Sequence, residues 1–169
     1  MEIRKGKKAD YVCLLKIFEQ ARAFMKAQGN SSQWKDNRPS SELVREDLRK
    51  GRNYVVVQDR EIVGTFVLLP GVEPSYAEIQ GTWRNSGPYL TIHRVASAGV
   101  AKGIFQAMMD FARKEAKQQG VLSLRIDTHE NNQPMRHLIQ KAGFHFCGVI
   151  SLDDGSPRFA YERCITDSF

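Results

Sequence analysis

Residues 89–105 read YLTIHRVASAGVAKGIF and join a strand, a loop of small side chains and a helix start. The β-branched and aromatic residues that predict the strand are Tyr89, Thr91, Ile92 and Val95. The apolar residues at helical spacing after the loop are Ile104, Ala107, Met108, Phe111 and Ala112. A helix start carries partial positive charge, and small side chains let a ligand approach backbone N–H groups. The segment therefore predicts a site for a phosphate or pyrophosphate.

The composition indicates one soluble globular domain over residues 1–169, with 41% hydrophobic and 26% charged residues. No apolar run approaches the roughly 20 residues of a membrane span, and no apolar stretch follows the basic N-terminus as in a secretory signal. We therefore expect a cytoplasmic protein without a membrane partner. The three cysteines (Cys13, Cys147 and Cys164) are odd in number and far apart, which predicts reduced thiols and no disulfide or zinc framework.

The net charge of +6 fits a polyanionic ligand, either a coenzyme or a nucleic acid. The basic residues are scattered and form no run beyond Lys7-Lys8. A solvated basic surface explains the charge equally well, and the scatter disfavours a nucleic-acid partner.

Periodicity predicts the element order β-α-α-β-β-β-α-β-α-β-β. The expected strands are 2–5, 53–58, 61–69, 89–96, 121–127, 144–151 and 158–165, and the expected helices are 9–28, 41–50, 104–119 and 133–142. This order predicts an α/β (α+β layered) fold, with a mixed central β-sheet flanked by helices on both faces. Gly64 inside a strand predicts a bulge or a close backbone approach. The long connection 70–88 is of the kind that is usually functional.

Two segments of the sequence stand out as motifs: His93-Arg94-Val95-Ala96 at a strand end, and Asn132 followed by Lys141-Ala142-Gly143-Phe144 at a helix end. They resemble the GNAT superfamily of acetyl-CoA-dependent N-acetyltransferases, in a small bacterial branch. In that family the first segment is the strand end that pairs with pantetheine, and the second is the N…K-x-G-F segment. The family loop [Q/R]-x-x-G-x-[G/A] aligns with residues 100–105, where only Gly103 matches. The coenzyme residues that the resemblance implies are Val95, Ala96, Ser97, Gly99, Val100, Ala101, Lys102, Gly103, Ile104, Phe105 and Asn132.

The resemblance implies transfer of an acetyl group from acetyl-CoA to a primary amine of a small molecule or peptide by direct attack. A base must take a proton from the amine, and backbone N–H groups at the strand end could polarise the thioester carbonyl. His93 is the first candidate for the base or proton relay, because its reference pKa suits that role; a packed strand histidine is the equal alternative. Asp127, at the end of the next strand, is a second candidate, although it could instead cap the loop that follows. No ligand spacing for a metal occurs among the histidines and cysteines.

One departure from the family pattern concerns the proton donor. The family tyrosine that protonates the departing thiolate aligns with Ile139, which has no proton to give. Tyr161, His93 and His137 are the possible replacements, and a donor of this kind contributes about 10²–10⁴-fold. Ile139 and the degenerate loop 100–105 therefore keep open a CoA-binding module without turnover. The basic charge keeps open a third interpretation, an enzyme of the same chemistry that acetylates aminoacyl-tRNA.

The acceptor is not identified by any motif. Trp34, Tyr76 and Trp83 lie in two polar loops, where aromatic rings could enclose a substrate or pin the loops to the body. Glu19 could line the same site, although a solvated helix face is the commoner role for such a residue. The closing strands could also pair across a homodimer.

Overall fold

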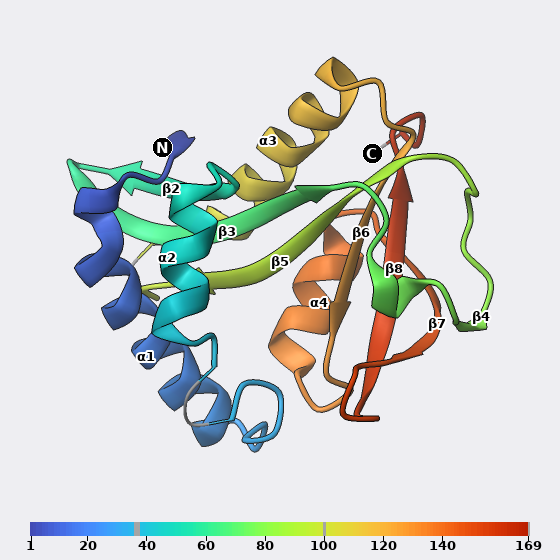
Figure 1. The fold of residues 1–169 in the computed structure, drawn as a ribbon, viewed down its shortest axis with the longest axis horizontal. Coiled ribbons are helices and arrows are strands. Elements are labelled where there is room, and N and C mark those ends of the chain that lie inside the picture. The colour runs from blue at the N-terminus through green and yellow to red at the C-terminus, as the bar shows by residue number, and fades with distance from the viewer. Residues whose placement is uncertain (36–37, 100, 169) are drawn as a thin grey trace. The chain divides into compact units, whose positions relative to one another are not determined.

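The computed structural model describes residues 1–35, 38–99 and 101–168 (Figure 1). The strands are β1 (Glu2–Lys5), β2 (Asn53–Gln58), β3 (Glu61–Pro70), β4 (Gln80–Gly81), β5 (Tyr89–Ser97), β6 (Ser123–Thr128), β7 (His145–Ser151) and β8 (Pro157–Cys164). The helices are α1 (Tyr11–Ala27), α2 (Ser41–Arg49), α3 (Ile104–Gln118) and α4 (Gln133–Lys141), with short 3-10 turns η1 (Lys8–Asp10) and η2 (Pro74–Tyr76). The predicted elements are thus confirmed with small shifts at their ends.

The eight strands form one sheet in the order β1-β2-β3-β5-β6-β8-β7-β4. β5 and β6 are parallel, and β1–β2, β2–β3, β6–β8, β7–β8 and β4–β7 are antiparallel. The predicted mixed sheet is therefore confirmed. The chain divides into two compact units, the first comprising Met1–Leu68 and His93–Met108, and the second comprising Leu69–Ile92 and Met109–Phe169.

In the first unit, α1 and α2 lie side by side over the strands (Figure 1). Their apolar faces share one core with β2 and the end of β5, formed by Leu14, Ile17, Phe18, Ala21, Val44, Val55 and Ala96. Both a bulge and a close backbone approach, the two features predicted for Gly64, are confirmed. The β2–β3 register shifts beside it, and a Cβ there would lie 2.8 Å from Ile104 and from Met108. Thr65 is the partner of Val55, which packs in the core beneath α1, and the neighbouring Gly64 points to the other face of the strand. Because Gly64 faces Ile104 and Met108, α3 begins on the face away from α1.

In the second unit, β6, β8 and β7 carry different neighbours on their two faces. On one face Tyr76, Tyr89, Ile150 and Ala160 form a buried cluster that the connection 70–88 completes. On the other, Arg163 of β8 donates to the carbonyl of Ala142 at the end of α4, with an N–O distance of 2.7 Å.

The sequence did not predict η2 and β4, which both lie in the connection 70–88. β4 has only two residues, too few to show a period, and it pairs Gly81 with Gly148 of β7. Any Cβ at Gly81 would lie 2.0 Å from the carbonyl oxygen of Cys147, so the two backbones meet more closely than a side chain permits. Glycine usually weakens a strand, but here its missing side chain allows β4 to pair with β7.

The three cysteines are free thiols, as the sequence predicts. Burial is the main cause that raises the pKa of Cys13, Cys147 and Cys164 above the usual value, so each thiol stays protonated at neutral pH. Among the helices of the described ranges, none combines the length and apolar character needed to cross a bilayer.

Candidate acetyl-transfer site

The loop between β5 and α3 presents its backbone to solvent in the first unit. Ser97, Gly99, Lys102 and Gly103 are exposed, whereas Ile104 and Phe105 at the start of α3 are buried and anchor the helix. Gly99 and Gly103 have φ values of 71° and 78°, and no atom lies within 4 Å of a Cβ built at either. The space above this backbone is therefore open where the first N–H groups of a 15-residue helix emerge. Val100, also predicted to hold coenzyme, lies outside the described residues.

These features fit the pyrophosphate that the sequence predicts for this loop. The α3 macrodipole favours negative charge at this helix start. Lys102 is exposed beside it and can add a point charge. Phe105, in place of the family's small residue, points into the core with 8% exposure, so its bulk leaves the loop surface clear.

β5 contains a non-glycine residue in the left-handed region, Arg94, with φ of 50°. Its guanidinium makes a bidentate ion pair with Asp47 of α2, with N–O distances of 2.7 and 2.9 Å. Arg52 binds the same carboxylate through Nε at 2.5 Å, and Asp47 is only 2% exposed. A single left-handed residue costs about 1–2 kcal/mol, and this two-arginine clamp (Asp47, Arg52 and Arg94) offsets it. The bend that it holds lies between His93 and Val95, at the predicted thioester position.

Tyr76 and Asp127 are brought together in the second unit. The Tyr76 hydroxyl donates to Oδ2 of Asp127 at 2.6 Å, and the Trp83 indole donates to the Tyr76 carbonyl at 3.0 Å. Burial, followed by the charge of Asp127, raises the pKa of Tyr76 well above its usual value, so this hydroxyl stays a donor. Tyr76 is 2% exposed and half-buried Trp83 packs on it, with ring centroids 5.1 Å apart. Both rings thus fasten the connection 70–88 to the sheet.

Asp127 and Tyr161 lie on opposite faces of the sheet, because Asp127 is opposite Ala160 and Tyr161 is opposite Ile126 in the β6–β8 register. Tyr161 is buried, and its hydroxyl accepts from Nε of Arg136 on α4 at 3.3 Å. Ile139, one turn further along α4, is fully buried. Ile139, which stands where the family has its tyrosine, is therefore an apolar core contact. The phenol that contacts α4, through Arg136, is that of Tyr161.

The remaining predicted residues have separate positions. His93 is half-buried on β5 in the first unit, and Glu19 is exposed on α1. Trp34 packs edge-on against Phe18, with ring centroids 5.6 Å apart. Asn132 is the N-cap of α4 and accepts from the N–H of Met135 at 3.2 Å. Asn132 thus caps α4 within the second unit.

Sequence reasoning missed two buried carboxylates. Asp47 was hidden in a helix that reads as amphipathic and solvated, and Glu162 in a closing strand. Glu162 accepts from the N–H groups of Arg84 and Asn85 at 2.6 and 3.0 Å, and from Nε of Arg125 at 2.6 Å. The partners of Glu162 lie 37 or more residues away, and Asp47 pairs with Arg94 across 47 residues as well as with nearby Arg52, so no local pattern marks either carboxylate as buried. Within residues 1–35, 38–99 and 101–168, no three histidine, cysteine or acidic side chains gather as a metal site would require.

Comparison with known proteins shows which family combines this sheet, loop and helix. The profile of the acetyltransferase (GNAT) family matches residues 20–144, and the chain belongs to that family.

Two solved structures and one curated relative are similar to this chain. An acetyltransferase of the GNAT family from Streptococcus agalactiae 2603 is 28% identical, covers 96% of this chain and 94% of its own, and superposes with a TM-score of 0.84. A protein from Staphylococcus aureus Mu50 is 25% identical, with coverage of 98% and 100% and a TM-score of 0.74. The streptothricin acetyltransferase of Escherichia coli is 29% identical over 91 residues, which are 54% of this chain and 45% of that relative. The chain thus spans less than half of the curated relative it matches.

Proposed function

We propose that the protein transfers the acetyl group of acetyl-CoA to a primary amine of a small-molecule or peptide acceptor. The observation that carries the proposal is the loop 97–103, whose open, left-handed glycines lead into α3 in a chain of the GNAT family. Its exposed backbone would hold the pyrophosphate, and Lys102 would add charge. Acetyl-CoA supplies an activated acyl group, and no covalent enzyme intermediate is needed.

The chain's own residues would supply positioning and proton transfer. The two-arginine clamp holds the bend at Arg94, which would present β5 N–H groups to the developing oxyanion. His93, one residue earlier, would accept the amine proton directly or through water. Tyr161 is the proposed proton donor, because the Arg136 guanidinium beside its oxygen stabilises the charge left after donation. One carboxylate oxygen of Asp127 accepts from the Tyr76 hydroxyl, and Asp127 would hold this hydroxyl in position.

A second candidate function is coenzyme binding without turnover, which the full burial of Ile139 favours. Release of CoA thiol, followed with a thiol reagent over a panel of primary amines, distinguishes the two. Growth of one acetylated amine in the mass spectrum, in step with thiol release, supports the transferase. Coenzyme binding without thiol release above the hydrolysis background across the panel would support the binding module instead.

A further inference from the structure

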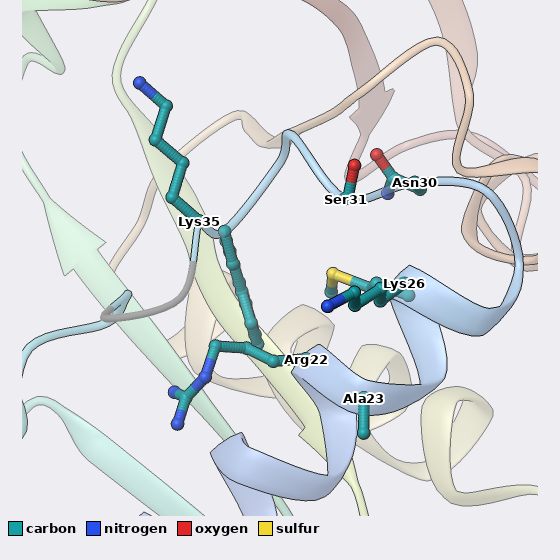
Figure 2. Close-up of a pocket in the computed structure, with 8 residues that line it drawn as sticks. Arg22, Ala23, Lys26, Asn30, Ser31 and Lys35 are labelled. Atoms are coloured by element: carbon teal, nitrogen blue, oxygen red, sulfur yellow. The ribbon is translucent and has the colours of Figure 1, made fainter.

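The net charge of +6 is divided unequally between the two units. The first unit, which contains the pocket of about 570 Å³ at the end of α1 (Figure 2), has 16 basic and 9 acidic residues. The second unit has 9 basic and 10 acidic residues. The second unit is therefore the one whose net charge does not oppose a positively charged ligand.

Asp127 is a half-buried carboxylate of the second unit, placed where a strand ladder ends. The β5–β6 pairing ends at Ile92 and Ile126, and Asp127 is the next residue of β6. Its Oδ2 accepts from the Tyr76 hydroxyl at 2.6 Å, which fixes the plane of the carboxylate. Within residues 1–35, 38–99 and 101–168, its Oδ1 accepts no hydrogen bond and no cation pairs with it. Because a carboxylate is withdrawn from water at a cost unless donors meet it, this oxygen is suited to a ligand.

Thr91 supplies a second acceptor on the same face of the sheet. It is opposite Arg125, two residues before Asp127 on β6, and side chains two residues apart on a strand point to the same face. Thr91 is 1% exposed, and its Oγ1 has no hydrogen-bond partner among the described residues. A buried polar atom without a partner is unfavourable. The Thr91 and Asp127 oxygens can both accept, so the group that suits them is a donor with several N–H bonds.

The charges around Asp127 favour a donor that is positive. Arg158 of β8 is buried on the same face, two residues from Ala160, the partner of Asp127. Burial lowers the pKa of this guanidinium, and the charges of Asp127 and Asp154 oppose that shift. One cation is thus shared between two carboxylates. His129 stays neutral at pH 7, because burial and then the charge of Arg158 lower its pKa below the usual value. One negative charge therefore stays unbalanced.

We propose that Asp127 binds a second positive charge on the acceptor, so that the molecule acetylated is an amine that carries a further ammonium group. This inference rests on the proposed function. The ammonium donates to Oδ1 of Asp127 and to Oγ1 of Thr91, while the Tyr76 hydroxyl keeps the carboxylate in place. An acceptor with a single amine lacks these contacts and binds more weakly.

The probes are linear diamines from 1,3-diaminopropane to 1,6-diaminohexane, each compared with the amino alcohol of the same length, which replaces one ammonium by a hydroxyl. Thiol release with acetyl-CoA gives kcat and KM for each. We expect at least one diamine to have a kcat/KM about tenfold above that of its amino alcohol, chiefly through KM, and we expect this preference to shrink as salt is added.

The matched variants are Asp127→Asn and Asp153→Asn. Asp127→Asn keeps an oxygen for the Tyr76 hydroxyl and removes the charge, so the diamine preference should fall about tenfold. Asp153→Asn makes the same change at an exposed position of the same unit and should keep the preference within about twofold. Thr91→Val, which removes the hydroxyl and keeps the shape, should lower the preference about threefold.

Turnover of amines with no diamine preference in any pair would overturn the inference alone, and so would equal effects of Asp127→Asn and Asp153→Asn. A protein that releases thiol with no amine would refute the proposed function, and binding then judges the cation site. Backbone NMR shifts of Tyr76 and Thr128 with a diamine, for which Asp127→Asn weakens binding about tenfold, support the site. The absence of these shifts with every diamine would overturn it.

Discussion

His93 is the residue on which the proposed chemistry depends most. It lies one position before the left-handed Arg94 on β5, in the same unit as the coenzyme loop. Removing a proton acceptor slows the chemical step and leaves contacts to the coenzyme intact, since those are proposed to come from the backbone of the loop 97–103. His93→Ala should therefore lower kcat by about 10²–10⁴-fold with little change in the Kd of acetyl-CoA.

Steady-state kinetics and a coenzyme titration measure both quantities, and His93→Gln serves as the control that keeps a polar side chain of similar size. Unchanged kcat in both variants would remove His93 from the mechanism. A loss of acetyl-CoA affinity alongside the loss of kcat would instead assign His93 to coenzyme binding.

The contacts of Asp10 predict that the free energy of unfolding falls at acid pH. Arg4 donates to Asp10 at 2.8 and 3.1 Å and the N–H of Lys7 at 2.7 Å, and the Arg4 hydrogen bonds are the first cause that lowers the pKa of this carboxyl. A pKa lowered by folding gives stability that is complete above the unfolded value, near 4, and is lost as the pH falls through the folded value.

Asp10→Asn should cost about 1 kcal/mol of unfolding free energy above pH 5, and the difference from the wild type should shrink below pH 4. Urea unfolding at a series of pH values measures this difference. A difference that stays constant down to pH 3 would show that the stabilisation by Asp10 does not depend on the charge of its carboxylate.

At the scale of elements, the connection 70–88 is held by the buried carboxylate of Glu162. Glu162 is fully buried and binds the backbone of Arg84 and Asn85, while Arg125 bonds it and lies over the Trp83 and Tyr89 rings at 4.0 and 3.9 Å. Removing this charge leaves a buried guanidinium without its partner. Glu162→Gln should therefore destabilise the protein by about 3–5 kcal/mol.

Glu78→Gln is the matched control, because it makes the same change at an exposed position of the same connection and should stay within about 0.5 kcal/mol of the wild type. Denaturant unfolding compares the two. Equal small effects would show that the connection is fastened by its rings alone.

The elements that sequence could predict are those with a repeating apolar pattern or another local signal. The faces of α1 and α3 have such a pattern, and a glycine inside a strand pattern marks the bulge at Gly64. The two-residue β4 and the burial of Tyr76 have no such signal, because each depends on a partner elsewhere in the chain. The sequence leaves open whether the aromatic residues around Tyr76 enclose a substrate or pin the loop, and it does not reveal that the Tyr76 hydroxyl donates to Asp127, 51 residues away.

At the scale of the whole molecule, family membership makes the fold and an acetyl-transfer role predictable from sequence, whereas the acceptor depends on residues that the family pattern does not fix. Asp47 and Arg94 meet across 47 residues, and Glu162 accepts from the N–H of Arg84 across 78 residues. Spacing along the chain does not reveal such sites, and only the folded arrangement does.

The central claim is that the loop 97–103 holds the coenzyme through its backbone. Its most direct test is thermal unfolding with saturating acetyl-CoA for the wild type, Gly103→Val and Gly120→Val. Both glycines are left-handed, at φ of 78° and 69°, with no atom within 4 Å of an added Cβ, but Gly120 follows the far end of α3. Both variants should therefore lose similar stability without ligand.

At about 100 times its Kd, acetyl-CoA stabilises a protein by about 2.7 kcal/mol, which for this size raises Tm by roughly 5–10 °C. We expect that rise for the wild type and Gly120→Val, and a much smaller rise for Gly103→Val, whose side chain would cover the backbone proposed to bind phosphate. An absent rise in the wild type, or an equal rise in both variants, would contradict coenzyme binding by this loop.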